Sequence, residues 1–156
     1  MSSISNRTWG DRYTHLAKEI STWSKDPNTK VGAVVIGKDG QVLSQGYNGF
    51  PRGIKDSSSR FKNRERKLEL VVHAEMNAIY NACLSGISLK GSTLYVYGLP
   101  ICNECAKGII QVGIKKVVAM RPKVYNTQWD ESIKNAEKIF NEAEVMYLID
   151  IEEWYE

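Results

Sequence analysis

The chain has 156 residues, with 21 basic and 18 acidic side chains and a formal net charge of +3 at pH 7. This size predicts one domain over residues 1–156, and the small net charge does not favour nucleic acid as a partner. No apolar run approaches the roughly 18 residues of a membrane span, and the N-terminus has no apolar signal region. We therefore expect a cytoplasmic protein without membrane contact.

The first predicted element is an amphipathic helix over residues 8–24. Its apolar side chains recur at helical spacing and are expected to pack in the core: Trp9, Tyr13, Leu16, Ile20 and Trp23. A base-stacking role for these aromatic rings is the less favoured alternative. Pro27 disfavours helical backbone at Asp26, so the helix is expected to end before it.

Two strands follow, over residues 31–36 and 41–47, joined by the turn signal Lys38-Asp39-Gly40. The next stretch, residues 46–53, is rich in glycine and proline and is expected to form a loop. Residues 56–60 are polar. The charged segment with Arg64, Arg66 and Lys67 is expected to form a solvated helix face, and an anion site there is the less favoured alternative.

A second helix is predicted over residues 74–84, with Met76, Ile79, Tyr80 and Cys83 near its apolar face. Cys83 is interpreted there as a small buried hydrophobic side chain. The pattern then alternates, with strands over 93–97, 116–120 and 145–149 and helices over 102–112 and 130–142. The last of these helices turns Ile133, Ala136, Ile139 and Phe140 to one face.

This order of elements predicts an α/β fold of three α/β/α layers around a mixed five-stranded sheet. The strand–helix–strand stretch over residues 93–120 is expected to form a right-handed parallel unit. The cysteines number three, Cys83, Cys102 and Cys105. An odd number without an export signal argues against a disulfide framework.

Chemistry concentrates where two of the predicted helices begin. His73 and Glu75 open one helix, and Cys102 and Cys105 open another. One imidazole and two thiolates supply three zinc ligands, which leaves the fourth position open as in catalytic sites. Helix N-termini also stabilise thiolates. Glu75 then has the position of a general base and acid that serves a metal-activated water.

The His-x-Glu and Cys-x-x-Cys motifs, in this order, match the signature of zinc nucleobase deaminases. The chain resembles the deoxycytidylate (dCMP) deaminase family of the zinc-dependent cytidine deaminase superfamily. The resemblance is carried by four segments: Ser24-Lys25-Asp26-Pro27-Asn28 with Val31-Gly32-Ala33, Gly46-Tyr47-Asn48-Gly49-Phe50-Pro51, His73-Ala74-Glu75-Met76-Asn77-Ala78-Ile79, and Cys102-Asn103-Glu104-Cys105-Ala106-Lys107. It covers residues 9–148.

The resemblance implies a cytidine deaminase-like fold and hydrolytic deamination of dCMP to dUMP. His73, Cys102 and Cys105 would bind one Zn²⁺ per chain, and Glu75 would move protons. For the substrate, the resemblance implies Asn28 at the sugar hydroxyl, Ser24 and Lys25 near the 5′-phosphate, and Tyr125 over the substrate.

Regulation is also implied by the resemblance. The family is commonly a homohexamer, activated by dCTP with Mg²⁺ and inhibited by dTTP. The corresponding nucleotide site would include Asn48, Gly49, Phe50 and Arg52. Residues 52–72 contain no Cys or His, so the further structural zinc of some members is not expected here.

One position departs from the signature. In the signature Pro directly precedes Cys, whereas in this chain Ile101 lies between Pro100 and Cys102. Alternative functions are a deaminase that also uses dCTP or cytidine, and a tRNA adenosine deaminase with salt-sensitive RNA binding. A zinc-stabilised module without catalysis is the non-enzyme alternative.

Overall fold

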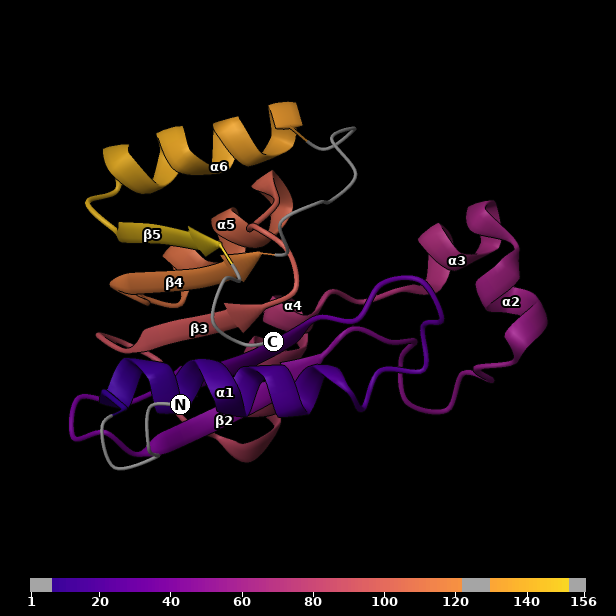
Figure 1. Ribbon diagram of the computed structural model, residues 1–156, viewed down its shortest axis with the longest axis horizontal. Coiled ribbons are helices and arrows are strands. Elements are labelled where there is room, and N and C mark those ends of the chain that lie inside the picture. The colour runs from indigo at the N-terminus through magenta and orange to yellow at the C-terminus, as the bar shows by residue number, and fades with distance from the viewer. Residues whose placement is uncertain (1–6, 122–129, 152–156) are drawn as a thin grey trace.

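The structure is a computed structural model that describes residues 7–121 and 130–151. Its elements are α1 (Trp9–Ser21), β1 (Gly32–Ile36), β2 (Val42–Tyr47), α2 (Ser58–Lys62), α3 (Arg64–Leu70), α4 (Ala74–Ser85), β3 (Thr93–Tyr97), α5 (Asn103–Gln111), β4 (Lys116–Arg121), α6 (Asp130–Glu142) and β5 (Met146–Ile151) (Figure 1). No helix within these residues is long and apolar enough to cross a membrane.

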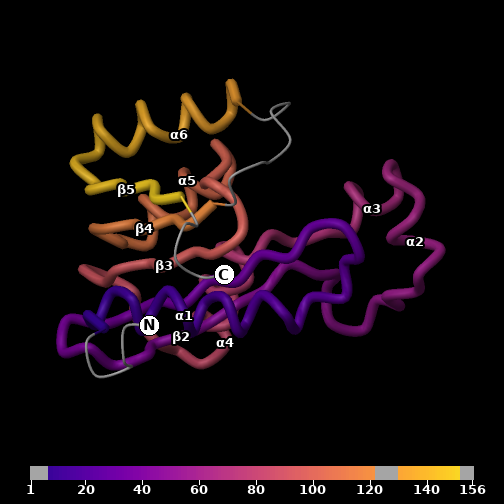
Figure 2. The backbone as a smooth tube through the Cα atoms, in the orientation of Figure 1, coloured from indigo at the N-terminus to yellow at the C-terminus, as the bar shows by residue number. Residues whose placement is uncertain are grey.

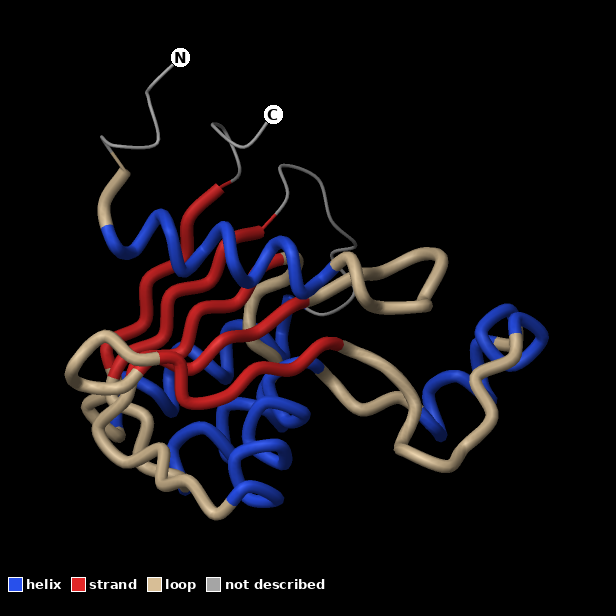
Figure 3. Tube along the Cα trace, turned by 90° about the horizontal axis from the view of Figure 1, so that it is seen from below, coloured by secondary structure: helices blue, strands red, loops and turns tan. Residues whose placement is uncertain are grey.

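The five strands form one mixed sheet in the order β2-β1-β3-β4-β5. β1 is antiparallel to β2 and β3, whereas β3, β4 and β5 run parallel to one another. Figure 3 shows α1 on one face of the sheet and further helices on the other. The predicted mixed five-stranded sheet with helices on both faces is confirmed, as is the parallel unit formed by β3, α5 and β4.

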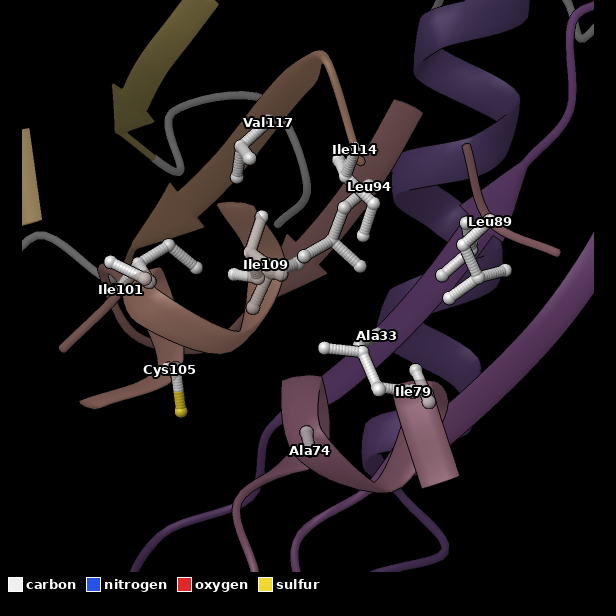
Figure 4. Packing of buried hydrophobic residues seen from close by; sticks show 14 of the residues in the cluster. Ala33, Ala74, Ile79, Leu89, Leu94, Ile101, Cys105, Ile109, Ile114 and Val117 are labelled. Carbon is white, nitrogen blue, oxygen red and sulfur yellow. The ribbon is translucent and has the colours of Figure 1, made fainter. Parts of the chain in front are cut away.

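The main core lies between the sheet and the helices opposite α1. Its buried members include side chains from α4, α5, β3 and β4, several of which are labelled in Figure 4: Ala33, Ala74, Ile79, Leu89, Leu94, Ile101, Cys105, Ile109, Ile114 and Val117. The sulfur of Cys105 points out of this cluster, away from Val117 (Figure 4). Side chains of α5 thus pack in the core, while the Cys105 thiol lies at the surface of the cluster.

Helix α1 covers the other face with a smaller cluster of Ala17 and Ile20 against Val34, Ile36 and Tyr95. The helix begins as predicted, with Thr8 and Asp11 forming a capping box. It ends at Ser21, because the amide groups of Trp23 and Ser24 bond three residues back and tighten the chain into turns.

The core interpretation is wrong for both tryptophans of the helix predicted over residues 8–24. Trp9 is 65% exposed and Trp23 is 52% exposed. Trp9 stacks on Tyr13, and Trp23 lies edge-on to Tyr47, with ring centroids 6.0 Å apart in each pair. The two rings flank the helix ends, beyond the part of α1 that faces the sheet.

Helix α4 lies unusually close to β2. A Cβ atom on Gly46 would sit 2.3 Å from the Ala78 amide nitrogen and 2.5 Å from the Ala74 carbonyl oxygen. Asn77 and Asn81 donate hydrogen bonds of 2.7 Å to the carbonyls of Tyr47 and Gln45. The start of α4, where Glu75 lies, is therefore fixed against the sheet edge.

This close approach also corrects the predicted apolar face of α4. The buried residues are the small side chains Ala74, Ala78 and Ala82 together with Glu75 and Ile79. Tyr80 is 52% exposed, and Cys83 is exposed rather than buried. Only alanines fit between the helix and a strand that itself lacks a side chain at Gly46.

Between β2 and α4 the chain leaves the sheet and carries α2 and α3 away from the body of the molecule (Figure 2). We call residues 50–72 the arm. Two short helices occupy the region expected to be a polar stretch and a solvated helix face. In α2 the buried residue is Phe61, which stacks on Phe50 at 4.3 Å, and α3 buries no residue.

Candidate active site

His73 and Cys102 occupy equivalent positions at the starts of two helices. His73 is the N-cap of α4 and Cys102 is the N-cap of α5, each with extended backbone. The Cys102 sulfur accepts a hydrogen bond from the Cys105 amide at 3.5 Å, and Cys105 is buried in the first turn of α5. Both helices direct their N-terminal ends, which favour negative charge, toward the same point.

The three side chains converge as a metal site requires. His73 Nδ1 lies 3.5 Å from Cys102 Sγ and 3.3 Å from Cys105 Sγ, and all three ligand atoms lie within 4.8 Å of one another. Tetrahedral zinc, with Zn–S of about 2.3 Å and Zn–N of about 2.0–2.1 Å, separates N and S by roughly 3.5 Å. The residues therefore fit Zn²⁺ with one position open.

No second group of this kind occurs within residues 7–121 and 130–151. The expectation of one zinc per chain, without a further structural zinc, stays a prediction. A single cation bound by two thiolates and one neutral imidazole would have no net charge, which suits a partly buried site.

Contacts within the protein favour the thiolate form of Cys102. Hydrogen bonds from the Cys105 thiol, His73 and the Cys105 amide lower the pKa of Cys102 to about 4. The same contact, together with burial, raises the pKa of Cys105. The hydrogen bond to Cys102 raises the pKa of His73. Of the two cysteines, Cys102 therefore has the negative sulfur, which attracts a cation.

Glu75 is the one buried carboxylate beside this group among the described residues. It is 4% exposed, and its Oε2 lies 3.9 Å from Cys105 Sγ. Burial raises the pKa of Glu75 to about 7, against the opposing effect of His73. A carboxyl group with this pKa can both accept and donate a proton near neutral pH.

A cavity of about 530 Å³ opens over these residues. Its lining comes from five regions of the chain: Asp26, Asn28, Thr29, Lys30, Val31, Asn48, Arg64, Lys67, Leu68, Val71, His73, Ala74, Glu75, Tyr97, Gly98, Leu99, Pro100, Cys102 and Ile133. This volume lies within the roughly 300–1,000 Å³ of small-molecule sites. The chemistry-bearing residues and a ligand-sized space therefore coincide.

Of the residues expected to contact substrate, some line this cavity and others do not. Asn28 lines the cavity. Ser24 is buried outside the lining and donates to the Asn48 carbonyl at 2.8 Å. Lys25 also lies outside the lining, paired with Asp56 at 2.8 Å. Tyr125 lies outside the described residues.

The expected regulatory residues have contacts within the chain. The Asn48 amide accepts from the Val31 amide and donates to the Thr29 carbonyl, both at 2.8 Å. Gly49 pairs with Val72 as an isolated antiparallel bridge. Asn48, which directly follows β2, is thereby bonded to the segment that leads into β1, beside the cavity.

The two remaining expected regulatory residues lie at the base of the arm. Phe50 stacks on Phe61 with an interplanar angle of 14°. Arg52 is exposed, and it donates a hydrogen bond of 2.6 Å to Asn81 on α4. The Phe50–Phe61 stack lies within the arm, and the Arg52–Asn81 hydrogen bond connects the arm to α4.

Sequence reasoning did not single out Asp26 as a site residue. Its carboxylate, 1% exposed, accepts from the amides of Asn28 at 2.9 Å and Thr29 at 3.2 Å. It also pairs with Lys67 of α3 at 2.6 Å. The order Asp-Pro-Asn is a turn signal that predicts the amide contacts, but no local pattern predicts the partner 41 residues away.

Comparison with known proteins gives consistent findings. Residues 7–121 match the family of the cytidine and deoxycytidylate deaminase zinc-binding region. A protein of Aliivibrio fischeri, named an uncharacterized deaminase in the luxG 3′ region, is 38% identical over 138 residues, covering 88% of this chain and 90% of that protein. Deoxycytidylate deaminase of Homo sapiens is 38% identical over 144 residues, covering 89% of this chain and 78% of that protein.

The fold is similar to a solved structure as well. The crystal structure of dCMP deaminase from the cyanophage S-TIM5, in complex with dCMP and dUMP, superposes with a TM-score of 0.70. That protein is 28% identical, and the match covers 88% of this chain and 93% of that chain.

Proposed function

This chain belongs to the cytidine and deoxycytidylate deaminase family, and from that membership we propose that it hydrolyses dCMP to dUMP and ammonia. The observation that carries the proposal is the convergence of His73, Cys102 and Cys105 beside buried Glu75, at a cavity that His73, Cys102 and Glu75 line. The similarity to proteins named deoxycytidylate deaminase, and to a structure solved with dCMP and dUMP, supports this choice of substrate.

His73, Cys102 and Cys105 would hold Zn²⁺. Zinc in such a site lowers the pKa of a bound water to about 7 and so supplies a nucleophile at neutral pH. The protein must then place the cytosine ring beside this position and exclude other water. Pro100, Leu99 and Val71 supply apolar walls to the cavity for this purpose.

Glu75 would handle the protons. Hydrolysis adds the water oxygen to C4, transfers protons to the ring nitrogen and the exocyclic amine, and breaks the C4–N bond to release ammonia. One carboxylate can accept the first proton at Oε2 and deliver it to the substrate, and then repeat the transfer to the leaving group. The pKa of about 7 that burial gives Glu75 suits both directions of transfer.

Asn28 would orient the sugar. It lies in the lining of the cavity, in a turn fixed by the Asp26 carboxylate through the amides of Asn28 and Thr29. A preformed turn reduces the entropy lost when substrate binds. This arrangement supports a nucleotide or nucleoside, rather than a free base, as the substrate.

The direct test is ammonia release from purified, zinc-loaded protein offered dCMP, dCTP, cytidine and deoxycytidine in parallel. Release from dCMP well above the other three supports the proposal. Equal release from dCTP would indicate the broader deaminase, and no release from any of the four would contradict an enzymatic function.

The proposal includes regulation by nucleotides, as in the family that the sequence resembles. dCTP with Mg²⁺ would activate and dTTP would inhibit a homohexamer, through a site that includes Gly49, Phe50 and Arg52. In its support, Arg52 is exposed and Phe50 sits at the base of the arm. The amide of Asn48 is already bonded to main chain, so its part in that site would be to hold the loop.

Saturation curves for dCMP with and without each nucleotide test this part of the proposal. A shift in the half-saturating dCMP concentration is expected, and linkage requires dCMP to shift nucleotide affinity by the same factor. Superimposable curves would remove the regulatory proposal and leave the catalytic one. Hexameric assembly and a cytoplasmic location remain predictions.

A further inference from the structure

The Asp26 carboxylate lies where the arm meets the body of the molecule, and it is 1% exposed. Its Oδ1 accepts hydrogen bonds from the amides of Asn28 at 2.9 Å and Thr29 at 3.2 Å. Its Oδ2 pairs with Lys67 Nζ of α3 at 2.6 Å. All four residues line the cavity. One buried group therefore contacts both the turn that carries Asn28 and the arm.

On the arm side, the ion pair is largely removed from water, because the Lys67 side chain is only 17% exposed. Loss of one partner would leave the other charge buried without compensation. The pair thus favours the arm position in which Lys67 reaches Asp26. α3 itself buries no residue, so apolar burial contributes little to holding this helix. We expect the ion pair to be important in keeping α3 at the cavity.

On the body side, Asn48 holds both ends of the turn. The Ser24 hydroxyl donates to the Asn48 carbonyl, and the Asn48 side-chain amide donates to the Thr29 carbonyl, both at 2.8 Å. Between these two anchors, the Asn28 amide is bonded to Asp26 Oδ1. The ends of the turn are thus fixed to the body, whereas its middle is fixed by a carboxylate that also faces the arm.

We infer that Asp26 is a positioning residue through which the arm helix α3 sets the place of Asn28 in the cavity. The two oxygens of a carboxylate belong to one rigid plane, so the orientation that directs Oδ2 to Lys67 also directs Oδ1 to the turn. Without Lys67 the carboxylate can rotate, and the amides of Asn28 and Thr29 lose a fixed acceptor. The inference deepens the proposed function and rests on it for the role of Asn28 at the sugar.

The metal-ligating end of the cavity is fixed by other contacts. Gly49 and Val72 exchange main-chain hydrogen bonds of 3.1 and 2.8 Å immediately before His73. A change at Lys67 should therefore alter how tightly the sugar is held rather than the chemistry at Glu75. Loss of an interaction that the bound substrate and the transition state share raises KM and leaves kcat unchanged.

The first test measures hydrogen exchange of individual amides by NMR on the zinc-loaded full chain without ligand. Lys67→Met removes the charge and keeps an unbranched side chain on a helix that buries no residue, so the variant is expected to fold. Exchange at Asn28 and Thr29 should accelerate at least tenfold, the effect of weakening one hydrogen bond to a charged group. The Val31 amide, bonded at 2.8 Å to Asn48 instead, should change less than twofold.

Asp56→Asn is the matched control, because it breaks a different ion pair between the arm and the same turn. Asp56 pairs with Lys25 at 2.8 Å, and the two side chains are 46% and 69% exposed. This variant should leave exchange at Asn28 and Thr29 within twofold. Unchanged exchange in Lys67→Met would overturn the inference. So would an equal acceleration at Val31, or the same acceleration in Asp56→Asn.

The second test is a double-mutant cycle on the KM for dCMP. Lys67→Met should raise KM about 10–100-fold and change kcat less than threefold, with zinc content unchanged. In an Asn28→Ala background the same substitution should change KM less than twofold, because the effect passes through Asn28. Equal increases in both backgrounds would show that Lys67 acts on the ligand directly, and they would overturn the inference.

Failure of this inference and failure of the proposed function are distinguishable, because the exchange experiment needs no substrate. A wild type that releases no ammonia, with fast exchange at Asn28 and Thr29 confined to Lys67→Met, would contradict the deaminase and keep the positioning role of Asp26. A wild type that deaminates dCMP, with slow exchange retained in Lys67→Met, would contradict only the positioning role.

Discussion

Tyr147→Phe should show how the chain accommodates Ile101, the residue between Pro100 and Cys102 that departs from the deaminase signature. Ile101 is fully buried, and its amide donates a hydrogen bond of 2.9 Å to the Tyr147 hydroxyl on β5. A proline at position 101 would have no amide hydrogen to satisfy. Tyr147 thus supplies the acceptor that the isoleucine requires, immediately before Cys102.

The expected cost follows from this geometry. Phenylalanine keeps the edge-on ring contact with Phe140, whose centroid is 4.9 Å away, so little packing is lost. The buried Ile101 amide loses its partner, and an unsatisfied buried donor costs about 1–3 kcal/mol. We expect the free energy of unfolding to fall by this amount.

Urea unfolding of the metal-free protein measures the change, with unchanged m-values showing that the compared states are the same. A double-mutant cycle with Ile101→Pro isolates the hydrogen bond, because proline removes the donor. Tyr147→Phe should cost little when Ile101→Pro is already present. A cost below about 0.3 kcal/mol in the original background, or the same cost in both, would refute the reasoning.

Further predictions concern packing and the metal. Gly46→Ala should destabilise the fold by about 1–3 kcal/mol, because its Cβ would meet the main chain of α4 at 2.3 Å; thermal or urea unfolding measures this. Gly10→Ala, in α1 with its nearest neighbour at 3.7 Å, should instead stabilise by roughly 0.5–1 kcal/mol, and a loss of stability would contradict the open space seen there. Chelation of zinc should lower the melting temperature and abolish turnover, with recovery on adding Zn²⁺. Cys105→Ser should fail to recover both, and full recovery would exclude Cys105 as a ligand.

Much of the fold could be predicted because its signals are local. The turn at Lys38-Asp39-Gly40 separates β1 from β2, and the apolar spacing of Ile133, Ala136 and Phe140 defines the buried face of α6. His73 could be assigned to a helix start because Val71 and Val72 precede it as a strand end or loop, and Cys102 because Pro100 precedes the helix. These features depend on residues that are near one another in sequence.

The arm could not be predicted in the same way. α3 buries no side chain, so it has no apolar periodicity to detect, and α2 depends on one aromatic contact with Phe50. The apolar face of α4 was misassigned for a related reason. Its contact residues are alanines, and their role depends on Gly46 in another element.

Charged side chains were the least predictable part of the candidate site. Lys25 lies beside the Asp26-Pro27-Asn28 turn in sequence, yet it pairs with Asp56 in solvent. Lys67 lies far along the chain, yet it reaches the buried Asp26. Both are lysines on flexible stems, and only the path of the arm decides which one faces the cavity.

The central claim, that Glu75 moves protons beside a metal held by His73, Cys102 and Cys105, is tested most directly by Glu75→Gln. Zinc content and ammonia release from dCMP should be measured on the same preparations of variant and wild type. The account predicts one zinc per chain in both proteins and a fall in kcat of about 10²–10⁴-fold in the variant. A zinc-loaded Glu75→Gln protein that turns over dCMP at the wild-type rate would contradict it.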